Sequence, residues 1–476
     1  MSQVDAQTYF NTRIDNNQSW WDYSWNLYAD STSIYWTYGT STGLGLSGFR
    51  VASIARLDLS GNIVSVNNYL DTDTNFLYYF GGAKSLTKLF DGFILGGTWV
   101  DRMQKDAVLL RLDNSGDTLW TRNYGDSTDQ SGWMAIEDWD NGFLLCGQSE
   151  SIDTFTNALV IRTDSMGNVL WQTEVGVGGY NERFVSICRT ANGCALAGRK
   201  RDLFNLNFDT YVALVDSFGV AYWDTSFITQ NHDELWSITS TQDGNFVVAG
   251  DFASTTPGLN YPYVAKFDLN GQLLWQRKYG DSLLEASFNS IRELDDGSFI
   301  LTGKFYLPDT PWKARGLISK IASNGDSIWS MYYYNSFFGS NFLMDIIPIY
   351  DGSYVSCGVV FPSLPDTGHQ DLWLLRVDSM GCEQVNCIVG IAELQLPQNI
   401  QVYPNPFHDQ IRFKLPDEIG RPSELIIWDM LGREAYRTHI PQSSVDIDLA
   451  YALPGIYFAQ IISHGKQVFS CKIIKN

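Results

Sequence analysis

The chain has 476 residues, and its composition excludes several classes of protein. Apolar residues make up 44% and aromatic residues 14%, which suffices for a large core and excludes general disorder. With 32 basic and 53 acidic side chains the net charge is −21, and this field repels phosphate backbones and anionic lipid. No apolar stretch approaches the roughly 18 residues of a spanning helix. We therefore expect a globular protein without a transmembrane segment that binds no nucleic acid.

Charge is unevenly distributed along the chain, which locates a domain boundary. Residues 398–476 contain eight basic and eight acidic side chains, so the entire net charge lies in residues 1–397. We predict an acidic domain over residues 1–387, a linker over 388–400 and a small neutral domain over 401–476.

Two short patterns recur through the acidic domain. Seven copies of an apolar run end in Asp-x-x-Gly or a close variant, spaced 51 to 56 residues apart, with the first residue of each at 58, 113, 164, 216, 268, 322 and 378. Between them, Asp-Gly or Asn-Gly precedes an apolar run that closes on Gly, as from Asp91 to Gly97 and from Asp243 to Gly250. A period of this length indicates a propeller or a solenoid.

Each repeat unit is predicted to form four short antiparallel strands. Asp-Gly and Asn-Gly between apolar runs are strong hairpin signals, because both turn positions tolerate positive φ. A Leu-Trp strand follows most Asp-x-x-Gly turns, with Trp at 120, 171, 223, 275 and 329. Four strands cannot bury both faces of a sheet alone, and radial stacking of neighbouring units solves this problem. We predict a seven-bladed β-propeller.

The last unit lacks its own fourth strand, because no Leu-Trp run follows Gly381. In three other units the Trp stands 21 residues before the next Asp/Asn-Gly, and the same interval before Asp30 reaches Tyr9. We predict that a strand over residues 8–14 closes the ring in the last blade, with Tyr9 in the Trp position. Closure would also remove the exposed sheet edges.

The two faces of the predicted ring differ in their loops. One face has short Asp, Asn and Gly turns, whereas the other has longer, aromatic connections and is the better candidate for binding. The aromatic residues that we select as candidate ligand contacts on this long-loop face are Trp99, Trp133, Tyr180, Tyr261, Tyr306, Trp312 and Phe361. The alternative is that these side chains pack the loops onto the blades, since isolated surface aromatics are common.

These repeats resemble the delta-60-type repeats of secreted bacterial propellers, over about residues 8–382. They are also somewhat similar to quinoprotein dehydrogenase blades, but those have Thr before the Gly and one more residue before the Trp. Asp268 to Gly271 shows the departure, with Asn270 before the Gly. A quinone cofactor is therefore disfavoured.

The neutral tail contains alternating strand patterns and Pro and Gly punctuation, from which we predict a small antiparallel β-sandwich. Four blocks in order resemble the type A C-terminal sorting domain of the type IX secretion system of Bacteroidetes. The residues that carry this resemblance are Tyr403, Pro404, Asn405, Pro406 and Phe407, then Gly432, then Gly455 and Tyr457, then Lys472 and Lys475. The resemblance implies a partnership with the type IX machinery, passage across the outer membrane, cleavage within 388–400, and surface attachment or release.

Such cargo needs a signal peptide, yet Met1 to Asp5 contain neither a basic nor an apolar segment. The alternatives are a truncated or misassigned start and a vestigial sorting domain. We expect a secreted or outer-membrane-surface protein that is a monomer.

Seven cysteines include no Cys-x-x-Cys pair, and no His neighbours them at zinc-finger spacing, so no structural zinc is predicted. Cys382 and Cys387 follow the last Asp-x-x-Gly, and in an oxidising location we interpret them as a loop-closing disulfide, with free thiols as the alternative. Cys188 and Cys194 flank the Asn192-Gly193 turn and could pair, although the geometry is demanding.

Metal and acid–base chemistry receive little support. His232 and His369 stand beside acids in loops, where we expect solvated side chains; a metal or acid–base role is the alternative. The Asp-x-x-Gly carboxylates are too far apart to supply the oxygens that calcium requires, and we expect them to cap their own turns. A single calcium remains an alternative at a loop cluster beginning at Asp126.

Two function classes stay open. The first is a secreted or surface binding propeller, whose ligand is a glycan or a protein on the long-loop face, without catalytic residues or cofactor. The alternative is an extracellular polysaccharide hydrolase or lyase, because fold does not decide function. Two carboxyl groups about 5–9.5 Å apart in one pocket would favour a glycosidase. An aromatic pocket without a perturbed acid pair would favour binding.

Overall fold

The structure is a computed structural model of the chain. It describes residues 9–15, 19–42, 49–69, 77–79, 85–100, 104–126, 128–150, 155–176, 179–202, 207–227, 229, 232–254, 259–280, 285–307, 310–336, 339–363, 369–383, 400–415, 423–429, 434–440, 444–463 and 466–476. The chain divides into two compact units, Met1–Cys387 and Ile388–Asn476. Within the described ranges, no helix has the length and hydropathy that a membrane span requires.

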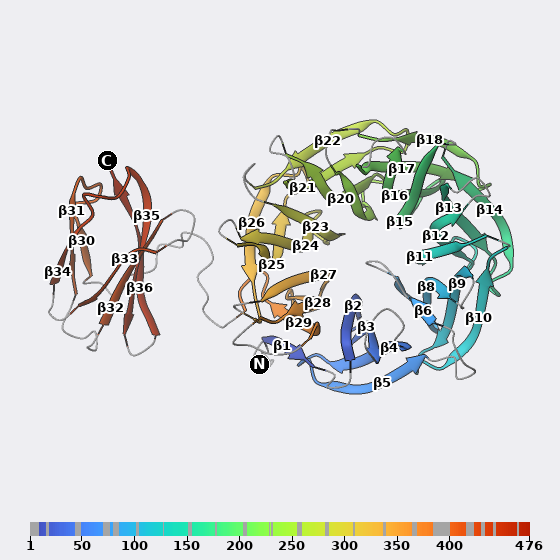
Figure 1. Cartoon of the computed structure of the whole chain (residues 1–476), viewed down its shortest axis with the longest axis horizontal. Coiled ribbons are helices and arrows are strands. Elements are labelled where there is room, and N and C mark those ends of the chain that lie inside the picture. Colours follow the sequence, from blue (N-terminus) through green and yellow to red (C-terminus); the bar gives the residue numbers. More distant parts are fainter. Residues whose placement is uncertain are drawn as a thin grey trace. The chain divides into compact units, whose positions relative to one another are not determined.

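The first unit is a β-propeller, as predicted, and its described residues form seven sheets arranged around a centre (Figure 1). The innermost strands are β2 (Ser19–Ala29), β6 (Leu77–Tyr79) with β7 (Leu86–Leu89), β11 (Gln130–Glu137), β15 (Tyr180–Thr190), β19 (Glu234–Ser240), β23 (Ala286–Glu293) and β27 (Ser340–Pro348). The second strands are β3 (Ser33–Thr42), β8 (Gly92–Val100), β12 (Phe143–Glu150), β16 (Gly193–Asp202), β20 (Phe246–Ala253), β24 (Phe299–Leu307) and β28 (Tyr354–Phe361).

The outer half of each sheet follows the same order. The third strands are β4 (Phe49–Asp58), β9 (Lys105–Asp113), β13 (Thr156–Thr163), β17 (Asp209–Asp216), β21 (Asn260–Phe267), β25 (Thr310–Ile321) and β29 (Asp371–Val377). The outermost strands are β5 (Ile63–Tyr69), β10 (Thr118–Tyr124), β14 (Val169–Val175), β18 (Ala221–Thr225), β22 (Leu273–Lys278), β26 (Ser327–Tyr333) and β1 (Phe10–Ile14). All pairings in these sheets are antiparallel.

The Asp-x-x-Gly turns are self-contained, as predicted. In the first of them, Asp58 Oδ1 accepts hydrogen bonds from the backbone N–H groups of Ser60 and Asn62, both at 2.9 Å. The hydrogen bonds from Asn62 hold the pKa of Asp58 below its usual value. Gly61 adopts a φ of 84°, which a residue with a Cβ rarely adopts. These carboxylates therefore serve their own turns.

The same turns also join neighbouring blades. A Cβ at Gly219 would lie 2.9 Å from the ring of Trp171 in the preceding blade, and one at Gly271 would lie 2.1 Å from Trp223. Each outer-strand Trp therefore packs flat against the glycine turn of the next blade. The Leu-Trp and Asp-x-x-Gly patterns recur together because they form one contact between blades.

The last sheet combines β27, β28 and β29 with β1, so the two ends of the propeller sequence meet in one blade. Phe10 pairs with Arg376, and a Cβ at Gly61 would lie 2.9 Å from the Phe10 ring. Phe10 thus occupies the position that Trp holds in other blades. The predicted Tyr9 is wrong by one residue, because the interval of 21 residues is not kept in the first blade.

A belt of polar side chains links the innermost strands. The Ile238 N–H donates to Ser186 Oγ of the preceding blade at 3.1 Å, and the Ile291 N–H donates to Ser237 Oγ at 3.2 Å. Fully buried Asp345, on β27, closes the belt by accepting from the Leu27 N–H of β2 at 3.0 Å.

The second unit is the predicted β-sandwich. One sheet contains β30 (Gln401–Tyr403), β31 (Gln410–Lys414) and β34 (Ser444–Asp448). The other contains β33 (Glu434–Ile440), β32 (Ser423–Asp429), β35 (Gly455–Ser463) and β36 (Lys466–Lys475). Their facing side chains, with Phe413, Ile427 and Ala459 fully buried, form one core.

The first and last sequence blocks of this unit meet in space. Asn405 Nδ2 donates to the Lys472 carbonyl at 2.9 Å, and Asn405 Oδ1 accepts from the Ile474 N–H at 2.9 Å. Buried Phe407 pairs with Lys475 in a parallel bridge. Blocks separated by more than 60 residues therefore form one structural feature.

The other predicted sorting residues divide into three groups. Tyr457 is buried and donates from its hydroxyl to the Leu453 carbonyl at 2.7 Å. Tyr403, Pro404 and Pro406 are exposed, whereas Gly432 lies outside the described residues.

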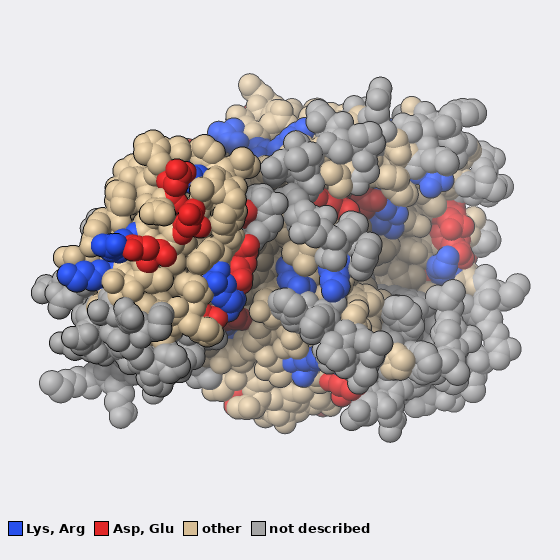
Figure 2. All heavy atoms as spheres, turned by 60° about the vertical axis from the view of Figure 1, so that its left-hand side comes forward, with Lys and Arg blue, Asp and Glu red and all other residues tan. Residues whose placement is uncertain are grey.

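Acidic and basic side chains lie next to one another on the face shown in Figure 2, rather than in separate patches.

Candidate functional site

A β-bulge recurs in six of the innermost strands and turns one side chain toward the centre of the propeller. In β19, for example, Leu235 pairs with Gly250 and Ser237 with Ala249, so Trp236 has no partner in the ladder. Bulges of this kind re-aim side chains. The six bulge residues are Trp25, Trp133, Val185, Trp236, Asn289 and Met344.

All six bulge residues line one central cavity of about 360 Å³. Its remaining lining residues are Tyr23, Lys304, Phe342, Val359, Phe361 and Gln370. The wall is mostly aromatic and apolar with a few polar groups, which is the usual composition of a ligand site. Tyr23 stacks on Trp25 with ring centres 5.6 Å apart, and Phe342 meets Phe361 edge-on at 5.4 Å. These contacts hold the rings in place.

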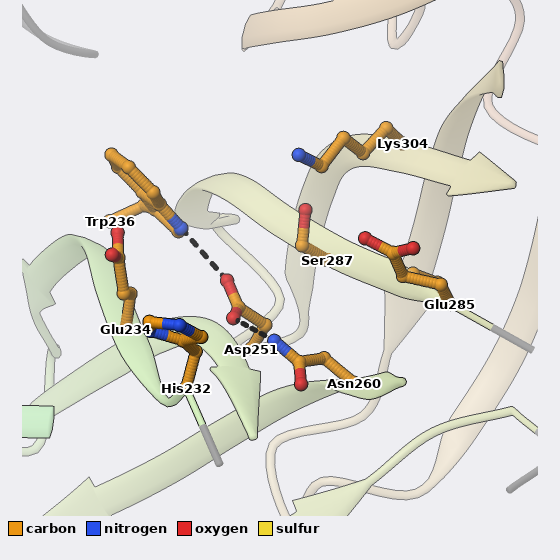
Figure 3. Close-up of a pocket in the computed structure, with 9 residues that line it drawn as sticks. His232, Glu234, Trp236, Asp251, Asn260, Glu285, Ser287 and Lys304 are labelled. Carbon is orange, nitrogen blue, oxygen red and sulfur yellow. Dashed lines mark hydrogen bonds between the residues drawn. The ribbon is translucent and has the colours of Figure 1, made fainter. Parts of the chain in front are cut away.

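A second cavity, of about 300 Å³, shares Trp236 and Lys304 with the central one (Figure 3). Its other lining residues are His232, Glu234, Asp251, Asn260, Glu285, Ala286 and Ser287. Apart from His232, which precedes β19, they come from β19 to β21 and from β23 with the residue before it, at the long-loop ends of these strands. We call the two cavities together the compound site.

Charged side chains occupy one repeat position, directly after the closing Gly, in two consecutive blades. Glu234 lies opposite Asp251, and Ser287 opposite Lys304, just before each bulge. Directly opposite residues of an antiparallel pair have Cβ atoms about 4.5–5.5 Å apart. Two carboxyl groups therefore face the same cavity from adjacent strands, beside one ammonium group.

Asp251 has the most strongly perturbed carboxyl group of the compound site. Burial and the nearby charge of Glu234 together raise its pKa to about 7, against the opposing effects of Trp236, Lys304 and Asn260. The Trp236 indole N–H donates to Asp251 Oδ1 at 2.9 Å, and Asn260 Nδ2 donates to Oδ2 at 2.7 Å. Asp251 can therefore give or take a proton near neutral pH.

Across the cavity, Glu285, Ser287 and Lys304 face Asp251 (Figure 3). Burial raises the pKa of Glu285, and the charge of Lys304 opposes this rise. Ser287 Oγ is buried and has no hydrogen-bond partner among the described residues. Because an unsatisfied buried hydroxyl is costly, Ser287 is a natural contact for a ligand.

Glu234 and His232 stand at the rim. Glu234 forms an ion pair with Arg199 of the preceding blade, which keeps it oriented beside Asp251. His232 is exposed, as expected for a loop residue, and its Nδ1 accepts from the Phe208 N–H at 3.2 Å. His369 is not among the lining residues of either cavity.

The structure distributes the predicted aromatic residues unevenly. Trp133 and Phe361 line the central cavity, and Tyr306 lies 6.2 Å from the ring of Phe342, which lines it too. Trp99 packs on the hydrophobic core of its own blade, in line with the alternative interpretation.

The other predicted aromatics stand outside the compound site or cannot be placed. Tyr180 and Tyr261 line neither cavity and have Lys200 and Lys278 at 4.2 and 5.7 Å from their ring centres. The Trp312 side chain lies outside the described part of the structure.

Sequence reasoning missed Trp236, Asp251, Glu285 and Lys304. The bulge that exposes Trp236 is invisible in an alternating pattern, which assumes an unbroken ladder. A usable signal existed for Asp251 and Lys304, because each directly follows the closing Gly of its repeat. Variation between charged residues at one repeat position indicates a functional surface.

Cysteine and metal predictions have different outcomes. Cys194 is a free thiol, so the possible disulfide between Cys188 and Cys194 is not formed; Cys188 pairs with Ala195 in the ladder and Cys194 pairs with Arg189. Cys382 is disulfide-bonded, and Cys387 lies outside the described residues. Among the residues described, no three His, Cys, Asp or Glu side chains gather as a metal site would require. Asp126 instead accepts from the Thr128 N–H at 2.7 Å.

The fold defines a β-propeller joined to a small β-sandwich. Residues 401–476 match the family model of the secretion system C-terminal sorting domain. The chain is therefore cargo of the type IX secretion system, and this domain marks it for export to the cell surface or beyond. No curated protein matches the chain.

The solved structures that the chain resembles include the following three. An alpha-L-arabinanase of Penicillium chrysogenum is 12% identical with a TM-score of 0.39, over 68% of this chain and 98% of that one. The propeller domain of the Pyrococcus furiosus Trilobed protease is 9% identical with a TM-score of 0.41, over 79% and 99%. PorZ, a surface component of the type IX secretion system of Porphyromonas gingivalis, is 9% identical with a TM-score of 0.23, over 98% and 100%.

Proposed function

We propose that the exported propeller binds a carbohydrate in the compound site. The observation that carries this proposal is the arrangement of the aromatic central cavity beside a polar cavity that shares Trp236 and Lys304 with it. Aromatic rings present flat apolar surface to the C–H face of a sugar, while their edges and polar neighbours orient it. Carboxyl, amide, hydroxyl and ammonium groups of the polar cavity supply hydrogen bonds for sugar hydroxyls.

A glycan array followed by titration calorimetry on the full chain tests this proposal. Trp236→Ala should weaken binding by about tenfold or more, because it removes an aromatic contact common to both cavities. Tyr350→Ala is the matched control, since Tyr350 is 70% exposed in a turn between the first two strands of the last blade. If no glycan binds, or if both variants lose affinity equally, the proposed site is wrong.

A specific observation favours a second function, hydrolysis of a polysaccharide. Asp251, with its pKa of about 7, lies opposite Glu234, which is ion-paired with Arg199. Glycosidases use two neighbouring carboxyl groups in different environments, one of them with a raised pKa. Incubation of the chain with a polysaccharide panel tests it: turnover that both Asp251→Asn and Glu234→Gln abolish would replace binding alone as the function.

Processing of the sorting domain is a separate proposal. We propose that the chain is cleaved within residues 388–400, after which the propeller is either attached to the surface or released as a monomer. Mass spectrometry of the exported protein tests this, because a new C-terminus should fall in that interval. An exported chain that retains residues 401–476 would contradict it.

A further inference from the structure

Three arginines lie on one face of the β15–β16 hairpin, beside the compound site. Arg183 pairs with Arg199, and Asn181 pairs with Arg201, so these four side chains alternate onto the same face of the ribbon. On the opposite face, Lys200 and Glu182 form their own ion pair at 2.7 Å. In a protein with a net charge of −21, such a concentration of positive charge needs a reason.

Within the described part of the structure, these arginines form one ion pair, between Arg199 and the carboxylate of Glu234. The Nε atoms of Arg183 and Arg201 are buried and have no hydrogen-bond partner there. Like charges directly opposite each other in a sheet are destabilising, and buried donors without acceptors add to this cost. Burial and the neighbouring charge of Arg199 lower the pKa of Arg183 to about 10, the direction expected of a crowded cation.

Two arginines of this face contact residues that line the cavities. The Arg183 guanidinium carbon lies 4.8 Å from the ring centre of Trp133, a bulge residue of the central cavity. Arg199 pairs with Glu234, which lines the second cavity. Phe208 packs against two of the arginines, with its ring centre 3.6 Å from the Arg199 guanidinium carbon and 5.4 Å from that of Arg201. Arg183 and Arg199 therefore lie beside residues that a ligand in the compound site would contact, and Arg201 shares their face of the hairpin.

We propose that the carbohydrate of the compound site carries a carboxylate group, as a sugar acid does, and that Arg183 and Arg201 bind this group. The inference rests on the proposed carbohydrate function and narrows it to acidic sugars. A planar guanidinium matches a carboxylate through two parallel hydrogen bonds. Glu234 neutralises one of the three arginine charges, so the arginine face can bind a ligand with one or two negative charges. The negative field of the whole domain repels long polyanions.

The test compares one oligosaccharide in two forms on the full chain. An oligosaccharide that contains uronic acid and the same oligosaccharide with its carboxylates reduced to alcohols differ only in the proposed recognition group. Calorimetry should show the acid form binding about tenfold or more tightly, with the preference falling as salt increases. Arg183→Gln and Arg201→Gln should remove the preference for the acid form.

Two further variants control for folding and for geometry. Arg277→Gln changes an exposed arginine on the outer strand β22 and should keep the preference. Arg201→Lys keeps the charge without the planar fork, so it should retain part of the preference and an unchanged melting temperature. Equal affinity for the two forms would overturn this inference while leaving carbohydrate binding intact. Failure of both forms, across acidic and neutral oligosaccharides, would overturn both proposals.

Discussion

The buried carboxylate of Asp345 offers a sharp test of how the ring is held closed. It accepts hydrogen bonds from the Leu27 N–H at 3.0 Å, from Ser290 Oγ at 2.7 Å and from Arg292 Nη2 at 2.9 Å. These partners come from the first and sixth blades, and Asp345 itself lies in the last blade between them. Asp345→Ala would remove all three interactions at once and leave the Arg292 charge partly buried without its partner.

The expected cost follows from that geometry. Removing one partner of a buried ion pair costs about 3–5 kcal/mol, and the Asp345 side chain is fully buried. Asp326→Ala is the matched control, because Asp326 pairs with Arg277 at 3.7 Å and is 65% exposed; its loss should cost about 0–1 kcal/mol. Asp345→Asn, which keeps an acceptor for Leu27, should fall between the two.

Guanidinium unfolding followed by tryptophan fluorescence measures these free energies on the full chain. The transition of Asp345→Ala should move to clearly lower denaturant than that of Asp326→Ala. A cost below about 1 kcal/mol, or one equal to that of the control, would refute the idea that this carboxylate joins the ends of the ring.

Three other predictions follow from the structure. Deleting residues 1–14 removes β1, so the propeller should melt at a clearly lower temperature in calorimetry; an unchanged melt would contradict closure by this strand. Folding raises the pKa of Asp251 to about 7, so its ionisation destabilises the fold as pH rises from about 4 to 7. Asp251→Asn should therefore gain stability relative to the parent chain by about 2–3 kcal/mol at most between pH 5 and pH 8, and a pH-independent difference in chemical unfolding would contradict this. Asn405→Ala breaks two hydrogen bonds to β36 and should destabilise the sorting domain by about 1–3 kcal/mol, measured as its own thermal transition; a change below 0.5 kcal/mol would count against a structural role.

The sequence alone predicted the propeller because its signals are local. Asp58 to Gly61 forms its turn from four consecutive residues, and the same chemistry repeats along the chain. Even ring closure could be inferred, since a missing strand at one end must be supplied from elsewhere. The exact register could not, because the first blade changes length and Phe10 replaces Tyr9 in the shared position.

The compound site was harder to predict because it depends on side chains brought together by bulges. Trp236 stands two residues before buried Ile238, and alternation alone places both on the same face of the strand. The bulge breaks this alternation and turns Trp236 toward the central cavity. Asp251 and Lys304 stand 53 residues apart in sequence and meet only because consecutive blades stack. Their chemistry was visible in the sequence, but their convergence was not.

The pairing of β1 with β29 has a consequence for the life of the chain in the cell. A growing polypeptide cannot complete its last blade until residue 377 has been synthesised, and the sorting domain follows soon after. A product that terminates before residue 377 therefore lacks both a finished ring and the sorting domain. Because the sorting domain is synthesised after the last strand of the ring, a chain that carries the sorting domain also contains every strand of the propeller.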